Sequence, residues 1–124
     1  MRYLLDANIC IRLFDTGNPA LKARVQQCNE GELGVSAIAF AEVAHGSANG
    51  KPPPMAVLDR FAGQVPVLPF DADSAKHYAA LPFVRGSFDR LIAAHALSLK
   101  LILVTDNVKH FADIPGLTVE NWTQ

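Results

Sequence analysis

Short apolar runs alternate along this chain with segments whose apolar residues recur at helical spacing. Five strands are predicted by apolar runs over residues 3–5, 32–36, 65–70, 101–105 and 116–121. Six helices are predicted over residues 7–14, 19–28, from 37 up to a loop at 46–54, and over 55–61, 71–81 and 88–99. This alternation predicts an α/β fold with a central, mainly parallel sheet and helices on both faces, in one domain over residues 1–124.

Turn and cap residues indicate where several of these elements end. Gly17 and Asn18 break the first helix, and Pro19 opens the second. Ser36 is placed to cap the third helix with its side chain. Prolines inside residues 65–70 predict an edge strand, because proline has no backbone N–H to donate to a neighbouring strand.

Acidic residues stand where the predicted strands end and where apolar helices run. Asp6 follows the first strand, and Asp106 follows the strand at residues 101–105. Because ligands of parallel sheets bind at the carboxyl ends of the strands, we expect both at one edge. Glu42 and Asp89 lie in two of the most apolar helices. Gathered carboxylates either protonate or bind a hard cation, so the four acids predict a Mg²⁺ or Mn²⁺ site.

Each acid also has a simpler explanation. Glu42 fits the solvated face of a helix, which normally exposes one polar stripe. Asp89 fits a residue that complements the dipole at a helix start. Asp6 and Asp106 fit turns in which an aspartate bonds its own backbone. One shared cation accounts for all four positions together, which is why we favour it.

Length and composition describe a globular protein. The chain has 124 residues, half of them apolar, which is enough to bury a core without disulfides. The N-terminus reaches Asp6 after three apolar residues, so we expect no signal peptide, no membrane span and a cytoplasmic location. Two cysteines are too few for a disulfide framework, and Cys10 is expected to be reduced in the core.

The net charge of −1 gives no basic footprint of the kind that nucleic-acid-binding proteins usually carry. With four of the twelve acids assigned to the site, eight acids remain against eleven Lys and Arg, which leaves a weakly basic rim. The candidates for phosphate contacts are Arg12, Arg85, Arg90 and Lys109. For each of them alone, a solvated charge is the simpler interpretation.

Four histidines, His45, His77, His95 and His110, are scattered along the chain and are poorly placed for a metal-free hydrolytic mechanism. His95 lies in an apolar helix, where a packed, hydrogen-bonded ring is the expected role. His45 follows Glu42 by three residues and shares its helix face, but we assign it no function.

Five segments of this chain resemble the PIN-domain ribonucleases of the VapC toxin family. They are LLDANICI (4–11), SAIAFAEV (36–43), FDRLIAAHAL (88–97), LVTDN (103–107) and PGLTVENW (115–122). The ordered set covers essentially the whole chain. The resemblance implies a PIN-like three-layer α/β/α sandwich and a Mg²⁺- or Mn²⁺-dependent endoribonuclease. Within the family, the segments at residues 88–97 and 115–122 of this chain are similar to those of the group named tRNA(fMet)-specific endonucleases.

The resemblance also implies partners and residue roles. Such proteins are toxins of type II toxin–antitoxin pairs, so it implies a VapB-like antitoxin, operator DNA reached only through that antitoxin, an RNA substrate and a homodimer. Asp6, Glu42, Asp89 and Asp106 match the family's acidic positions. A metal-activated water would then cut RNA to leave a 3′-hydroxyl and a 5′-phosphate. Asn8 and Thr105 lie beside the acids and are candidates for orienting them or a bound water, with turn chemistry as the equal alternative.

Two other functions remain to be distinguished. The first is a catalytically weak module that docks an antitoxin on operator DNA. The second is a haloacid-dehalogenase-type phosphatase, which needs a second acid two residues after the first, where this chain has Asn8. The chain also departs from the family that it resembles. Between Tyr78 and Phe88 it is about ten residues, or roughly three helical turns, shorter than the commonest members.

Overall fold

Five short parallel strands form the centre of the molecule, in the order β3-β2-β1-β4-β5. The computed structural model describes residues 1–15, 17–82 and 87–124. The strands are β1 (Tyr3–Leu5), β2 (Leu33–Ser36), β3 (Val67–Leu68), β4 (Ile102–Val104) and β5 (Val119–Glu120). All of β1 is buried, because both of its neighbours pair with it in parallel register and helices cover the sheet.

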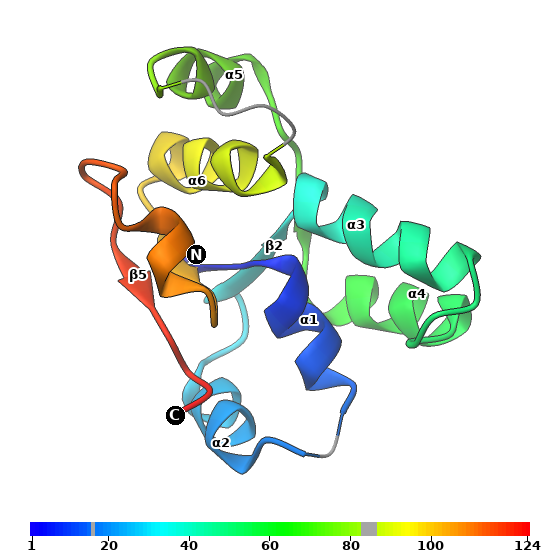
Figure 1. Cartoon of the computed structure of the whole chain (residues 1–124). Coiled ribbons are helices and arrows are strands. Elements are labelled where there is room, and N and C mark those ends of the chain that lie inside the picture. The colour runs from blue at the N-terminus through cyan, green and yellow to red at the C-terminus, as the bar shows by residue number, and fades with distance from the viewer. Residues whose placement is uncertain (16, 83–86) are drawn as a thin grey trace.

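Helices pack on both faces of this sheet. They are α1 (Ala7–Leu13), α2 (Pro19–Gln27), α3 (Ala37–Ala48), α4 (Met55–Gln64), α5 (Ala72–Ala79) and α6 (Phe88–Leu99), with a 3-10 turn, η1 (Val108–Phe111). Figure 1 shows α5 and α6 stacked on one face, with α1, α2 and α4 on the other. The predicted three-layer α/β/α architecture is therefore confirmed.

The chain reverses its direction across the sheet between β1 and β4. Strands β1, β2 and β3 follow one another toward one edge, and the chain then returns to place β4 on the other side of β1. At this point the backbone N–H of Asp6 donates to the carbonyl of Val104 at 3.1 Å. Crevices outside the carboxyl ends of strands at such a reversal are where open α/β sheets bind ligands.

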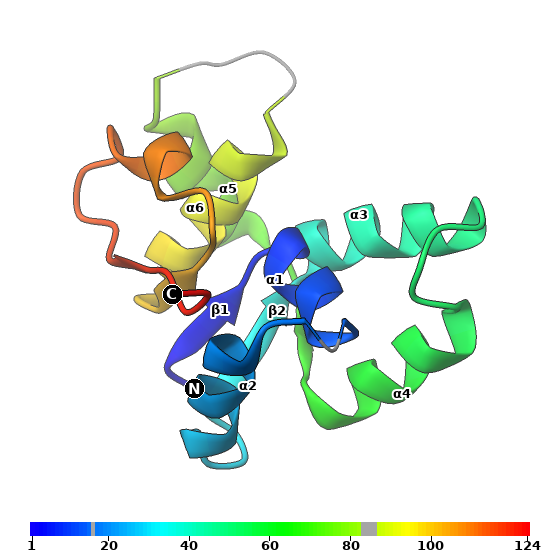
Figure 2. The same ribbon diagram turned by 60° about the horizontal axis from the view of Figure 1, so that its bottom comes forward.

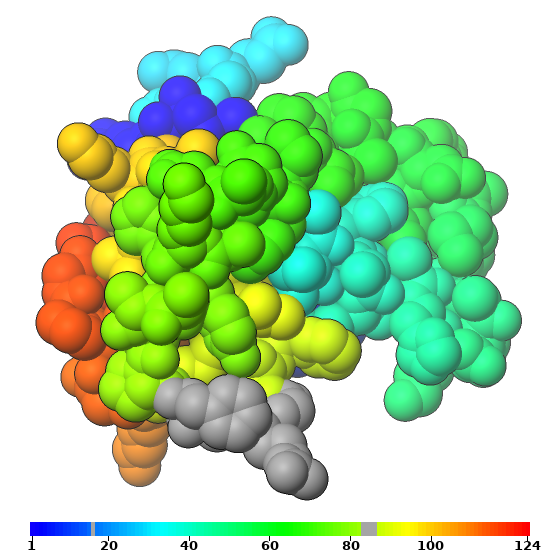
Figure 3. Space-filling model, turned by 90° about the horizontal axis from the view of Figure 1, so that it is seen from above, coloured from blue at the N-terminus to red at the C-terminus, as the bar shows by residue number. Residues whose placement is uncertain are grey.

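Helices α3 and α4 form an arm beside the sheet. Figure 2 shows both extending away from the strands, joined by a loop at their far end, and Figure 3 shows the same arm beside α5 and α6. The hydroxyl of Ser47 donates to the carbonyl of Pro53 at 2.6 Å and closes that loop. The arm presents one side of α3 to the start of α6.

Most predicted elements are confirmed, and the differences lie at their ends. The expected loop at residues 46–54 begins too early, because α3 continues through Gly46 to Ala48. Helix α4 reaches Gln64, three residues beyond its predicted end. The strand expected over residues 65–70 keeps only Val67 and Leu68, and it is an edge strand as predicted. Local signals fix the existence of these elements better than their ends, where tertiary packing decides.

Buried side chains from all three layers make the core. Cys10 is buried and free, as expected for a reduced core cysteine, and burial raises the pKa of its thiol. No helix in the described part of the chain has the length and apolar character needed to cross a membrane.

Candidate active site

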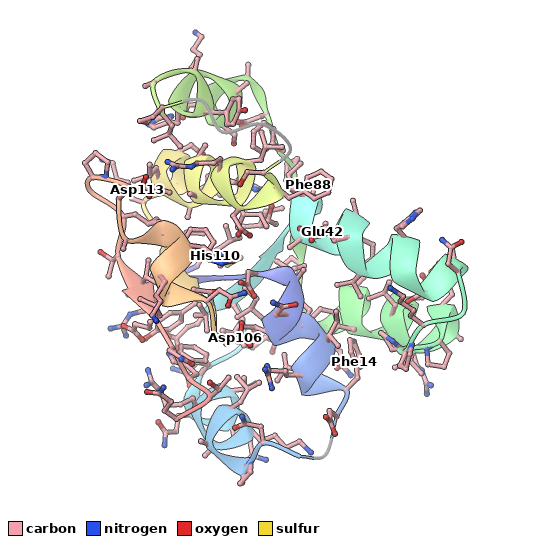
Figure 4. All side chains as sticks on the ribbon, viewed as in Figure 1. Phe14, Glu42, Phe88, Asp106, His110 and Asp113 are labelled. Carbon is pink, nitrogen blue, oxygen red and sulfur yellow. The ribbon has the colours of Figure 1, made fainter. Side chains whose placement is uncertain are left out.

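Four elements carry the four acids that the sequence singled out. Asp6 directly follows β1, and Asp106 lies just beyond β4. Glu42 belongs to α3, and Asp89 to the first turn of α6. Figure 4 shows Asp106 and Glu42 on either side of the start of α1. The charges of Asp89 and Asp106 both act on Asp6, so the acids gather around the carboxyl edge of the sheet.

Asp6 is the most buried of these acids, with 4% of its surface exposed. It caps α1: its Oδ1 accepts from the backbone N–H of Ile9 at 3.0 Å. Burial raises the pKa of Asp6 to about 6, the nearby charges of Asp106 and Asp89 act in the same direction, and its hydrogen bonds oppose them. A cap needs no such burial, so its turn chemistry does not account for its position.

Thr105 holds the second oxygen of Asp6. Its buried hydroxyl donates to Asp6 Oδ2 and accepts from the backbone N–H of Asn107 at 3.0 Å. The Asp6 carboxylate is thus fixed from both sides by groups on β4's end and on α1. Asn8, the other residue expected to orient an acid, is exposed in α1 and makes no side-chain hydrogen bond within the described ranges.

Glu42 lies half-buried in α3 with neither an ion pair nor a hydrogen bond to any residue that the structure describes. Burial raises its pKa, and the charges of Asp89 and Asp6 raise it further. These charges reach Glu42 from α6 and from the end of β1. A carboxylate held near others without a cationic partner is poised to accept a proton or to ligate a cation.

Asp89 pairs with His110, a histidine that no sequence pattern singled out. His110 Nδ1 lies 3.0 Å from Asp89 Oδ2, and both side chains are partly exposed. His110 belongs to η1, a turn that no local pattern predicted. Its only sequence signal was its place four residues after Asp106, which is too weak to identify a partner 21 residues away.

Asp106 pairs with Arg12 of α1. The guanidinium Nε of Arg12 lies 2.7 Å from Asp106 Oδ2, and the Asp106 side chain is only 12% exposed. The other oxygen, Oδ1, is buried and has no hydrogen-bond partner among the described residues. Buried polar atoms without partners are rare, so this oxygen is available to accept a hydrogen bond or to ligate a cation.

The acids do not form a ready-made metal cage. Among residues 1–15, 17–82 and 87–124, no three His, Cys, Asp or Glu side chains are arranged to hold one ion. The reason lies in the ion pairs, because Arg12 holds Asp106 and His110 contacts Asp89. Binding a cation at this edge therefore requires rotation of these side chains.

The predicted phosphate contacts differ from one another in the structure. Arg90 is a correction: its side chain is 9% exposed and binds Asp113 at 2.6 Å, so it faces the protein instead of a substrate. Arg12 is half-exposed at the acidic edge, and Lys109 is exposed beside His110. Arg85 lies outside the described residues.

His95 is fully buried between α6 and the start of α3, as expected for a packed ring. Its Nδ1 lies 2.9 Å from the hydroxyl of Ser36, which itself accepts from the backbone N–H of Ile38 at 3.1 Å. The ring packs edge-on against Phe70. Burial lowers the pKa of His95, although the charge of Asp71 acts the other way. His95 is therefore neutral and helps hold the helix that carries Glu42.

We expect His95 to make the protein less stable as the pH falls below about 6.5, the ordinary histidine pKa. The pKa of His95 is lower in the folded protein than in the unfolded chain. As the pH decreases, the unfolded chain therefore takes up a proton first, and the free energy of unfolding decreases. One proton gives a slope of at most about 1.4 kcal/mol per pH unit. Urea unfolding of the wild type and of His95→Asn between pH 5 and 8 measures this pH dependence. If the stability of the two proteins changed with pH in parallel, His95 would not be its cause.

Comparison with protein-family models gives one match, to the PIN domain, over residues 3–117. The chain is 31% identical to the tRNA(fMet)-specific endonuclease VapC of Shigella flexneri, with 99% of each chain covered.

Solved structures agree with this match along almost the full chain. VapBC2 from Rickettsia felis, bound to a DNA fragment from its promoter, superposes with a TM-score of 0.86 at 29% identity, covering 98% of this chain and 99% of the other. VapBC-1 from nontypeable Haemophilus influenzae superposes with a TM-score of 0.84 at 31% identity and full coverage of both chains.

Proposed function

This chain belongs to the PIN-domain family, among its VapC ribonucleases, and we propose that it is an endoribonuclease acting as the toxin of a type II toxin–antitoxin pair. Its substrate class is RNA. Transfer RNA is the first candidate, because the relative from Shigella flexneri is named a tRNA(fMet)-specific endonuclease.

One observation supports the proposal: carboxylates from four elements lie around the carboxyl edge of the sheet, where Asp6 is under the charges of Asp106 and Asp89, and Glu42 is under those of Asp89 and Asp6. Two of them, Asp6 and Glu42, have their pKa raised by burial and by neighbouring acids. Such an arrangement costs stability, and a structural role does not require it. Acids whose pKa is raised by burial and by neighbouring acids at a ligand-binding edge are typical of catalytic sites.

The residues fit a hard divalent cation. All four candidate ligands offer carboxylate oxygens, the donors that Mg²⁺ and Mn²⁺ prefer. Among the described residues, the buried Oδ1 of Asp106 has no hydrogen-bond partner, which fits a ligand oxygen for such an ion. We propose that Asp6, Glu42, Asp89 and Asp106 hold Mg²⁺ or Mn²⁺, which when bound lowers the pKa of a water and stabilises charge on the leaving oxygen.

The chain's own residues then have distinct tasks. Thr105 and the Ile9 N–H keep the Asp6 carboxylate in one orientation. Glu42, which has no ion pair among the described residues, brings a free carboxylate to the same edge. Arg12 reaches the same edge and can turn from Asp106 to a phosphate. Attack by water on phosphorus would leave a 3′-hydroxyl and a 5′-phosphate.

The proposed partner is a VapB-like antitoxin. The solved neighbours from Rickettsia felis and Haemophilus influenzae are VapBC complexes, and the first is bound to promoter DNA. We propose that this chain reaches operator DNA only through its antitoxin, in keeping with its net charge of −1. A homodimer is the proposed assembly, because two-fold dimers are the commonest oligomers.

Cleavage of end-labelled total tRNA tests the proposed function. The antitoxin-free protein is incubated with Mg²⁺, Mn²⁺ or EDTA beside Asp6→Ala and Asp89→Ala. Discrete cuts that need metal and are lost in both variants are the expected result. A catalytically weak module that only docks its antitoxin predicts the opposite. Growth arrest on expression in cells and antitoxin binding would then both survive the two substitutions.

We also expect Mn²⁺ to stabilise the wild type and to have little effect on Asp6→Asn. A ligand that binds only the folded state adds about 2.7 kcal/mol at one hundred times its Kd. Thermal unfolding with increasing Mn²⁺ measures this, and Asp113→Asn, which removes an acid that pairs with Arg90 and is not one of the four candidates, is the matched control. Equal shifts in the wild type and Asp6→Asn would refute the shared metal site.

A further inference from the structure

A cavity of about 560 Å³ lies between α3 and the start of α6. Its described lining is Ile38, Ala41, Glu42, His45 and Phe88. The four residues from α3 follow the spacing of a single helix face, which is the face that the α3–α4 arm turns toward α6. The lining is largely apolar, with Glu42 and His45 as its polar groups, and its size falls within the range of small-ligand sites.

Phe88 is the unexplained residue of this cavity. With 55% of its surface exposed, it is the most exposed large apolar side chain in the described part of the chain. It occupies the first position of α6, directly before Asp89. Figure 4 shows it beside Glu42, at the mouth between the two helices. The aromatic ring therefore lies next to Glu42, with much of its surface exposed to a ligand.

Glu42 belongs to both the cavity and the acidic edge. Its pKa responds to Asp89 and Asp6, and its side chain also lines the cavity wall opposite Phe88. In a polynucleotide, each base lies within one nucleotide of the neighbouring phosphates. A phosphate held at the acids therefore brings an adjacent base to this cavity without any further contact.

We propose that this cavity is a nucleobase subsite, in which Phe88 stacks on an unpaired base of the RNA next to the scissile phosphate. This inference rests on the proposed ribonuclease function and names the part of the substrate that the site grips. Base–aromatic stacking is tolerant of sequence, and it requires the base to be unstacked from its neighbours. Cleavage is thereby directed to single-stranded loops and ends.

One polar group on α3, His45, is left to contact the edge of the stacked base, because the Glu42 carboxylate serves the acidic edge. The exposed His45 ring offers either a donor or an acceptor. The Ile38 side chain supplies an apolar wall along the same helix face. The subsite thus combines the stacking surface and the edge contacts by which proteins hold splayed-out bases.

Binding of a short RNA separates stacking from backbone attraction. The probe is a fluorescein-labelled single-stranded decanucleotide in Ca²⁺, beside a ribose-phosphate decamer without bases. We expect Phe88→Leu to weaken the decanucleotide about tenfold and to leave the abasic chain unchanged, because stacking contributes on that scale. Phe88→Trp should bind like the wild type. Leu99→Ala, an exposed apolar residue at the other end of α6, is the control.

Two results overturn the subsite. The first is that the wild type and Phe88→Leu have the same ratio of affinities for the RNA and for the abasic chain. The second is a fall in molar mass by light scattering for Phe88→Leu with RNA binding unchanged, since that identifies Phe88 as a contact between two copies of the chain.

Total tRNA cleavage keeps the subsite and the nuclease apart. If Phe88→Leu cuts tRNA at the wild-type rate and with an unchanged KM, the subsite is rejected and the nuclease function is not. Phe88-dependent binding without any cutting rejects the nuclease alone.

Discussion

Asp6→Asn should raise the free energy of unfolding of the metal-free protein by about 3 kcal/mol at pH 7 while abolishing RNA cleavage. The acid is 4% exposed and its pKa is raised to about 6, chiefly by burial. A shift of about two pKa units corresponds to about 3 kcal/mol between its two protonation states. An amide keeps the bond from the Ile9 N–H to its oxygen. The bond with Thr105 reverses, because the amide nitrogen donates to the Thr105 hydroxyl, which gives up its own acceptor at Asp6 and reduces part of the gain.

The sign of the effect fixes its pH dependence. The folded pKa of Asp6 is above its unfolded value of 3.8, so the folded state holds the proton more tightly. Its ionisation therefore lowers the free energy of unfolding between about pH 4 and pH 6, and the loss stays constant above that window. Asp6→Asn lacks this loss, so the two proteins should differ little at pH 4 and most at neutral pH.

Urea unfolding in EDTA at pH 4, 5, 6 and 7.5 measures this difference. Asp113→Asn is the control with the opposite sign, because its hydrogen bond from Arg90 holds the pKa of the Asp113 carboxyl below its usual range. A stability gain for Asp6→Asn that is independent of pH would show that lost charge is not its cause. A stability loss at neutral pH would reject the buried, destabilising acid altogether.

Trp122→Ala should lower the free energy of unfolding by about 3–5 kcal/mol, the usual result of removing a buried tryptophan. Trp122 is 1% exposed although it lies beyond the last strand. Its ring meets Tyr3 of β1 edge-on at 4.8 Å between centroids, and the Arg24 guanidinium lies 4.7 Å above it. Its Nε1 donates to Glu120 at 2.8 Å, so the tail is tied to both β1 and β5.

Far-ultraviolet circular dichroism during urea unfolding measures this loss, because Trp122 is the only tryptophan and its fluorescence disappears with it. Trp122→Phe keeps an aromatic ring but loses the donor to Glu120, so it should fall between the wild type and Trp122→Ala. Leu99→Ala, at an exposed position, should change stability by less than about 0.5 kcal/mol. An unchanged urea midpoint for Trp122→Ala would show that the tail is not part of the core.

Local signals explain which parts of the fold were predictable. The strand at Tyr3–Leu5 and the helix at Phe88–Leu99 have the predicted bounds, because a short apolar run and strong helical spacing mark them. The end of α3 was predicted wrongly at Gly46, since a glycine inside a helix is tolerated when the helix packs well. The two-residue β3 was overestimated because an edge strand pairs on one side only.

The sequence by itself determined the order of strands and helices and the placement of Asp6 and Asp106 at strand ends, since both follow from patterns within a few residues. Only the tertiary structure decided which groups meet there. The Arg12–Asp106 pair joins residues 94 apart, His110 reaches Asp89 from an unpredicted turn, and Arg90 turns inward to Asp113. The approach of Phe88 to Glu42 likewise requires α3 and α6 to pack side by side. Such contacts depend on how whole helices dock, and no local pattern encodes that.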